Sequence, residues 1–338
     1  MSASALPGDS DRPMSYDASR FYEPWEQVVN SYPALTDFIG KTYTRWKASR
    51  RTFAWRGMPN STWSFHSSLH RRLWWTNPST VPDEERLLAR EGAILRDAHR
   101  WGLHRGEHGR LSILEQLAML QHFGAPTRLI DVSFNPLIAA WFAVQESRHD
   151  ALDGRLFAID VTSRLISEDD LFRWWEDTRR RPWTFERQGL EAADAERVLD
   201  ESRNWRTTVL AWKPPSFFGR ISRQAGGFLL GGVPAAVVRP GLAKAFQVPR
   251  GPNPEAGSWR IEEVRRSTSV ALRFHKADAA AGGVGTGGQP AYTLRISSSA
   301  KEEIRDRLEG LFGYDVKSLF GDFPGFATFG TPDLPLDR

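Results

Sequence analysis

The spacing of apolar side chains predicts amphipathic helices in the first half of the chain. Apolar residues recur every three or four positions over residues 34–50 and again over residues 83–101, where Asp83 can cap the first turn. The stretch 111–123 repeats this spacing and is followed by Gly124, a residue type that favours a helix end. These three segments are therefore predicted to be helices with one face against a core.

Shorter apolar runs, bounded by Gly, Pro and polar residues, predict strands. Asn135 and Pro136 predict the start of a very apolar helix, because Asn caps well and Pro fits the first helical position. A last helix is predicted over residues 299–313, with Ser299 as its cap and Glu302 as the capping-box partner. The predicted strands are residues 52–57, 127–133, 154–161, 207–214, 226–232, 269–274 and 291–297.

Helices come first and then alternate with strands that fall mostly in the second half of the chain. No βαβ unit with a glycine-rich phosphate-binding turn is visible, which favours an α+β fold over a doubly wound sheet. The expected architecture is a mixed, largely antiparallel sheet with helices packed around it. Residues 1–20 are expected to be a disordered tail, and residues 21–338 a single domain with insertions near 165–205 and 276–291.

Composition narrows the classes of protein further. The chain has 338 residues, of which 40% are hydrophobic and 25% charged, as in soluble globular proteins. It contains no cysteine, which excludes disulfides, thiolate catalysis and cysteine-ligated metals and fits a cytoplasmic location. The histidines between residues 99 and 108 match no metal motif, so no metal is expected. The net charge of +4 is too small to indicate nucleic-acid binding by itself, and the absence of a long apolar run predicts no membrane span.

Arg56 and Gly57 form the first candidate site. They stand at the end of a predicted strand, where arginine suits two-pronged binding of a phosphate or carboxylate and glycine allows a backbone turn or the close approach of a ligand. A surface arginine at an ordinary turn explains the spacing equally well.

The stretch 121–144, QHFGAPTRLIDVSFNPLIAAWFAV, places many polar residues beside a segment that must be buried. His122 extends the apolar stripe of its helix, which is more typical of a structural residue. Asp131 lies among apolar strand residues, and a buried Asp needs a hydrogen-bond partner, which Arg128 or a backbone cap could supply. With Thr127, these residues form either one wall of a cleft or a scaffold for the next helix.

A third cluster consists of Arg220, Arg223 and Gln224, followed by a strand that opens with two glycines. Two arginines beside a strand of small residues can line a cleft for an anionic ligand. A basic, solvated turn gives the same pattern.

Three stretches together resemble the FRG domain, a bacterial and phage family named for its Phe-Arg-Gly motif. They are FAWRG with SFHSSLHRR, then LAMLQHFGAPTRLIDVSFNPLIAAWFAV, then RISRQAGGF, and the later LEGLFGYDVKSLFGDFPGFATF is similar to that family's ending. The resemblance spans residues 53–329. Two positions differ, since Trp-Arg-Gly replaces Phe-Arg-Gly and Asp131-Val132-Ser133 replaces the usual Asp-Trp-Thr. Such proteins often look like parts of toxin or anti-phage defence loci.

The same motifs show a further likeness to the ADP-ribosyltransferase fold. This resemblance implies that Arg56 grips a phosphate of NAD, and that Thr127 or Ser133 holds the loop on the nicotinamide side. Gln224 then stands where that fold usually has a catalytic Glu, and Asp131 is the candidate to replace the missing carboxylate. The residues implied as catalytic are Arg56, His122, Asp131 and Gln224, and those implied to contact NAD are Arg56, Gly57, Thr127, Arg128 and Ser133.

Three hypotheses follow. In the first, which we favour, the chain is an NAD-dependent ADP-ribosyltransferase-like or NAD glycohydrolase toxin or anti-phage defence effector. It would act on a protein or nucleic-acid acceptor and have an antitoxin or defence-system partner. In the second, it is a non-catalytic module that binds a nucleotide or nucleic acid. In the third, the polar motifs only support the core. Both binding hypotheses require Arg56, His122, Asp131 and Gln224 to converge in one pocket.

Overall fold

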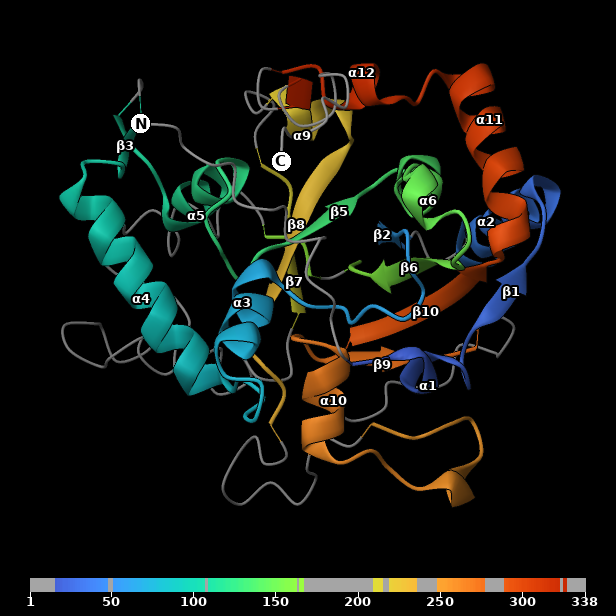
Figure 1. The fold of residues 1–338 in the computed structure, drawn as a ribbon, viewed down its shortest axis with the longest axis horizontal. Helices are drawn as coiled ribbons and strands as arrows, with labels where there is room; N and C mark the ends of the chain where they lie inside the picture. Colours follow the sequence, from blue (N-terminus) through green and yellow to red (C-terminus); the bar gives the residue numbers. More distant parts are fainter. Residues whose placement is uncertain are drawn as a thin grey trace, which may run out of the picture.

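An eight-stranded mixed sheet forms the centre of the structure, a computed structural model (Figure 1). The described residues are 16–47, 51–106, 109–162, 164–166, 209–214, 219–235, 248–276, 289–322 and 325–326. The strands are β1 Gln27–Val29, β2 Phe53–Met58, β5 Ile130–Ser133, β6 Gly154–Asp160, β7 Val209–Trp212, β8 Gly226–Gly231, β9 Leu272–Phe274 and β10 Gln289–Ile296.

The strands lie in the order β1-β10-β6-β2-β5-β8-β7, and β9 also pairs with β10. Strands β1 and β9 run parallel to β10, whereas every other neighbouring pair in the described sheet is antiparallel. Helices surround this sheet, so the predicted α+β fold with a mixed, largely antiparallel sheet is confirmed. Their bounds are α1 Ser19–Tyr22, α2 Tyr32–Lys47, α3 Ser68–Thr76, α4 Glu84–Arg100, α5 Ile113–His122, α6 Pro136–Val144, α9 Gly219–Arg223, α10 Ile261–Ser267, α11 Lys301–Phe312 and α12 Val316–Leu319.

Both faces of the sheet are buried. Alternate side chains of β2 point to opposite faces, so Ala54 packs in one core and Trp55 in the other. The first core includes residues of α1 and α10, and the second is formed with α2, α6 and α11. Helices α4 and α5 pack against β7 and β8 in a third cluster. A small ribbon of β3 Arg105–Gly106 and β4 Gly109–Arg110 follows α4.

Side-chain caps begin several helices where the local sequence predicted them. The Asp83 carboxylate accepts a hydrogen bond from the amide of Arg86 at the start of α4, and Asn135 caps α6 in the same way. Gly124 has a φ of 84° just after α5, the left-handed conformation that glycine adopts readily.

Three expectations about the ends of segments are wrong. Ser299 does not cap α11, because Ser298–Ala300 forms a 3₁₀ helix that continues into α11. Backbone carbonyls of this turn accept the hydrogen bonds from the amides of Ala300 and Lys301, so no side-chain cap is needed there. Residues 16–20, assigned to a tail, belong to the fold, and Ala18 is fully buried. Residues 289–291, assigned to an insertion, are the part of β10 that pairs with β9. The expected insertion at 165–205 lies almost entirely outside the described residues.

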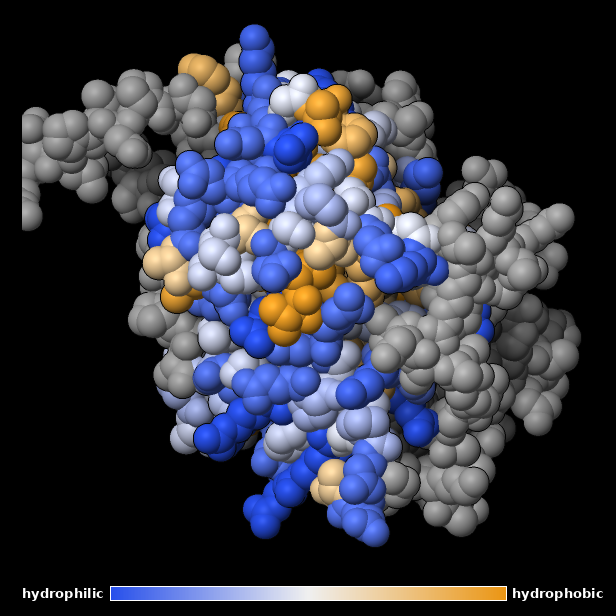
Figure 2. Space-filling view, turned by 90° about the vertical axis from the view of Figure 1, so that its right-hand side faces the viewer, coloured by the Kyte–Doolittle hydropathy of each residue, from blue (hydrophilic) through white to orange (hydrophobic). Residues whose placement is uncertain are grey.

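The surface that carries α11, on the right of Figure 1, is largely hydrophilic, with hydrophobic side chains gathered in small patches (Figure 2). None of the helices in the described parts of the chain combines the length and the apolar character needed to cross a membrane.

Candidate functional site

A cavity of about 300 Å³ lies between α5 and α6, over strands β2, β5 and β8, with α9 and Phe320 completing its wall. In the ribbon, α5, α6 and α9 lie around β5, which is a central strand of the sheet (Figure 1). Four aromatic side chains and a larger number of polar side chains line the cavity. The aromatic residues are Trp55, Phe142, Phe228 and Phe320, and the polar ones are Arg56, Gln121, His122, Asp131, Ser133, Arg220 and Gln224.

Arg56 supplies a half-buried positive charge at this cavity. Its Nη1 donates to the backbone carbonyl of Asp131 at 2.5 Å, and its guanidinium carbon lies 5.9 Å from the centre of the Phe65 ring. Its Nε is buried and has no hydrogen-bond partner among the described residues. Burial lowers the pKa of Arg56 to about 10, while Asp131 acts in the opposite direction. Arg56 is therefore still charged at neutral pH and retains a donor that a ligand could satisfy.

A chain of polar contacts holds Asp131. Gln121 donates from Nε2 to Oδ1 of Asp131 at 2.6 Å, and its own Oε1 accepts a hydrogen bond from Thr127. Thr127 is fully buried, and its amide donates to Ser68 at 3.0 Å. Thr127 therefore lies outside the cavity wall and positions Asp131 through Gln121. Asp131 is exposed and not buried as its apolar strand neighbours suggested, because it points to the cavity side of β5, so the rest of its carboxylate remains open to a ligand.

Gln121 is a residue of the site that the sequence analysis missed. A signal was present, because Gln121 follows Leu117 by four positions and Ala118 by three, which places it on the buried face of α5. A polar residue on such a face needs a hydrogen-bond partner, and Asp131 is that partner.

Ser133 and Gln224 join β5 to the turn before β8. The Ser133 hydroxyl donates to the backbone carbonyl of Gln224 at 2.7 Å, and the Gln224 side chain donates to the carbonyl of Leu319 at 3.1 Å. The next residue, Ala225, has a φ of 45°, a left-handed conformation that costs energy for any residue with a Cβ. The turn thus presents Gln224 to the cavity, with Oε1 of its amide as an acceptor.

His122 lies at the end of α5, on the same cavity wall as Arg220. Burial lowers the pKa of His122, and the charge of Arg220 lowers it further, although Asp322 opposes this shift. The imidazole is therefore neutral at pH 7 and can donate and accept one hydrogen bond each.

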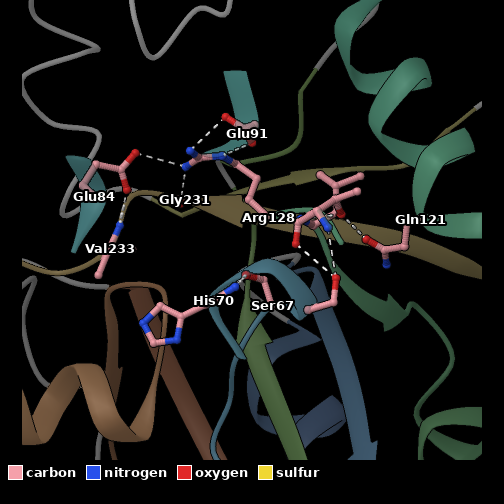
Figure 3. Close-up of polar contacts among 11 residues, drawn as sticks. Ser67, His70, Glu84, Glu91, Gln121, Arg128, Gly231 and Val233 are labelled. Atoms are coloured by element: carbon pink, nitrogen blue, oxygen red, sulfur yellow. Dashed lines mark hydrogen bonds and ion pairs between the residues drawn. The ribbon is translucent and has the colours of Figure 1, made fainter. Parts of the chain in front are cut away.

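Arg128 does not line the cavity. Its side chain points to α4, away from Gln121, and is only 1% exposed (Figure 3). It forms two hydrogen bonds with Glu91, at 2.6 and 3.0 Å, and one with Glu84 at 3.2 Å. Glu84 also accepts from the amide of Val233 at 2.7 Å. Arg128 thus fixes α4 against the end of β8 and does not partner the side chain of Asp131, as the sequence analysis had allowed.

Gly57 lines the cavity, but the packing of α6 already requires a glycine there. A Cβ at this position would lie 1.8 Å from the carbonyl oxygen of Ala139 and 2.7 Å from the amide nitrogen of Ala143. The close approach of α6 to β2 is what brings Phe142 to the cavity.

The structure therefore brings Arg56, His122, Asp131 and Gln224 to one cavity, with Gly57 and Ser133 beside them. It places Thr127 and Arg128 behind this wall. The described residues contain no group of three or more side chains suited to hold a metal ion, and His99 instead contacts Gln116 at 2.7 Å. A half-buried cation, amide groups, a carboxylate and aromatic rings together suit a ligand that is both anionic and aromatic.

Residues 51–151 match the family model of the FRG domain. The matched range runs from β2 past α6, and it includes Arg56, His122 and Asp131 but neither Arg220 nor Gln224. Searches of curated proteins and of solved structures give no match.

Proposed function

We propose that this FRG domain-containing protein binds NAD in the cavity and uses it as an ADP-ribosyl donor. The observation that carries the proposal is the half-buried guanidinium of Arg56, whose buried Nε has no hydrogen-bond partner among the described residues and which lies on the cavity wall with Asp131. Phosphate oxygens are suitable acceptors for such a donor, and the aromatic rings of the lining suit the nicotinamide or adenine base.

In this proposal the chain's own groups have separate roles. Arg56 binds a phosphate, and Gln224 accepts hydrogen bonds from ribose hydroxyls. The bond between ribosyl C1′ and the nicotinamide nitrogen breaks, and its electron pair leaves with the neutral nicotinamide. Asp131, oriented by Gln121, stabilises the positive charge that develops at C1′. The incoming nucleophile, from water or an acceptor, bonds to C1′ and gives its proton to Asp131. His122 donates or accepts one hydrogen bond as a neutral group.

The biological setting that goes with this proposal is a toxin or an anti-phage defence effector. Its acceptor would be a protein or a nucleic acid, and an antitoxin or a second defence component would control it. This part of the proposal rests on the resemblance to FRG proteins in such loci.

A non-catalytic nucleotide-binding module is the second candidate. Two features of the lining favour it. Gln224 is neutral and cannot act as a catalytic carboxylate, and the carboxylate of Asp131 already accepts a hydrogen bond from Gln121. A site with one engaged carboxylate can bind a nucleotide without promoting chemistry.

Calorimetric titration with NAD, combined with chromatography for released nicotinamide, separates these candidates. Arg56→Gln should weaken NAD binding at least about tenfold, because a charge-assisted hydrogen bond is lost. Asp131→Asn should bind NAD normally and release no nicotinamide. Arg100→Gln is the matched control, because Arg100 is 77% exposed, pairs with Asp97 on its own helix and does not line the cavity.

The three results have different meanings. Binding with nicotinamide release supports the donor role, and mass spectrometry of proteins and nucleic acids then identifies the acceptor. Binding without release assigns the non-catalytic module. If the wild-type protein does not bind NAD at all, both candidates fail for this ligand.

A further inference from the structure

Arg220 is a second arginine on the wall of the cavity, and Asp322 is bound to it. The Arg220 Nε donates to Oδ2 of Asp322 at 2.8 Å, and Nη2 donates to Oδ1 at 2.5 Å. The guanidinium carbon lies 5.3 Å from the centre of the Phe320 ring. This two-pronged arrangement over an aromatic ring is also the way in which arginine binds a phosphate group.

The Arg220–Asp322 pair is accessible to solvent, unlike the buried pair of Arg128 with Glu91. The side chains of Arg220 and Asp322 are 20% and 24% exposed, whereas those of Arg128 and Glu91 are each 1% exposed. Opening a partly exposed ion pair costs less than opening a fully buried one. Asp322 also accepts a hydrogen bond from the amide of Gly325 at 2.7 Å, so an anion that displaces it has to compensate for this bond as well as for the ion pair, at a cost below that of opening the buried pair.

The residues that carry Asp322 also limit the space in the cavity. We call residues 316–322 the α12 segment, since they comprise α12 and the three residues after it. Phe320 lines the cavity and packs on Phe142 with ring centres 5.8 Å apart, and Leu319 accepts the hydrogen bond from Gln224. At about 300 Å³ the cavity is at the lower end of the range for ligand pockets, so it accepts only part of a dinucleotide while this segment is in place.

We infer that Arg220 is a second anion subsite of the cavity, which takes a phosphate group of the ligand, and that Asp322 occupies it until that phosphate displaces the carboxylate. Arg56 and Arg220 would then hold the two phosphates of a pyrophosphate group. The α12 segment moves away when Asp322 leaves, and the cavity opens past Phe320 to admit the rest of the ligand. This inference deepens the proposed function, but the subsite itself requires only a phosphate-bearing ligand.

Titration with inorganic pyrophosphate tests the subsite without depending on NAD. Asp322→Asn removes the competing charge and should tighten pyrophosphate binding about fivefold. Arg220→Gln should weaken it about tenfold. Asp150→Asn is the matched control and should change nothing, because Asp150 forms the same two-pronged pair with Arg305, at 2.8 and 2.9 Å, and does not line the cavity.

Hydrogen exchange of the unmodified protein gives a second measurement that needs no variant. The amide of Leu319 donates to Asp315 at 3.0 Å, that of Phe320 to Val316 at 2.8 Å, and that of Asp322 to Phe320 at 2.7 Å. Saturating pyrophosphate should speed exchange at these three amides, since displacement of Asp322 releases the α12 segment. Slower or unchanged exchange would mean that the segment stays closed and would overturn the inference.

The outcomes distinguish this inference from the proposed function. Equal or weaker pyrophosphate binding by Asp322→Asn, or no binding by either protein, rejects the subsite even if NAD is bound. Tighter binding of pyrophosphate by Asp322→Asn supports the subsite even if NAD is neither bound nor consumed, in which case only the proposed function fails.

Discussion

Gly57 illustrates how one residue of a motif can serve the fold. The sequence suggested that this glycine allows a ligand to approach, but the nearest atoms to its missing side chain belong to the backbone of α6. Backbone atoms cannot move aside as the end of a flexible side chain can. A methyl group at this position therefore has to push α6 away from β2, and α6 carries Phe142 and Ala139 of the cavity wall.

Gly57→Ala should accordingly lower the free energy of unfolding by about 3 kcal/mol, the upper part of the usual range for overpacking. Urea denaturation followed by circular dichroism measures this change. Gly40→Ala is the control, because Gly40 lies in α2 with no atom within 4 Å of an added Cβ. That substitution should raise stability by roughly 0.5–1 kcal/mol, as alanine favours a helix over glycine. Equal effects of the two substitutions would contradict the packing argument.

At the scale of elements, buried ion pairs decide how α4 lies against the sheet. Arg128 comes from the residues before β5, while Glu84 is the first residue of α4 and Glu91 lies about two turns further along it (Figure 3). All three side chains are at most 3% exposed, so each charge depends on the others for compensation. Because its guanidinium is bound to Glu84 and Glu91, Arg128 does not line the cavity.

Glu91→Gln should lower the free energy of unfolding by about 3 kcal/mol, because it leaves part of the charge of Arg128 uncompensated in the interior. Asp97→Asn, on the same helix, removes a carboxylate whose pair with Arg100 is 65% and 77% exposed, and it should cost at most about 1 kcal/mol. Denaturant titrations of both variants compare these values. Affinity for NAD should stay the same in Glu91→Gln, and a loss of affinity with unchanged stability would instead point to a binding role for Arg128.

For the molecule as a whole, the sequence predicted local features, such as the starts of helices, better than contacts between distant segments. The starts of α4 and α6 were predictable, since Asp83 and Asn135 cap amides only two or three residues away. The order of the strands was not, because it depends on pairings between distant segments. The convergence of Arg56 with Gln224 was proposed only through a family likeness, and the sheet order β2-β5-β8 is its physical cause. The partners of Arg128 lie about forty residues away along the chain, so no local pattern could reveal them.

Stability of the whole molecule should fall in acid because of two buried histidines outside the cavity. His66 and His70 are both fully buried, with ring centres 4.2 Å apart, and His66 contacts the carbonyl of Arg265 at 2.8 Å. Burial lowers the pKa of His70 to about 3 and that of His66 well below its usual value, and the charge of Arg71 lowers both further.

The unfolded chain takes up a proton on each histidine near pH 6.5, whereas the folded protein does so only at much lower pH. The stability that these groups permit is therefore complete above about pH 6.5. It decreases as the pH falls below this value, by up to about 1.4 kcal/mol per pH unit for each histidine, and for His70 this continues toward pH 3. Free energies of unfolding from urea titrations at pH 7.5, 6.5, 5.5 and 5.0 measure this slope. His70→Gln removes one titrating group and should reduce the slope by about 1.4 kcal/mol per pH unit. An unchanged slope in that variant would show that other groups cause the acid sensitivity, since glutamine cannot take up the proton.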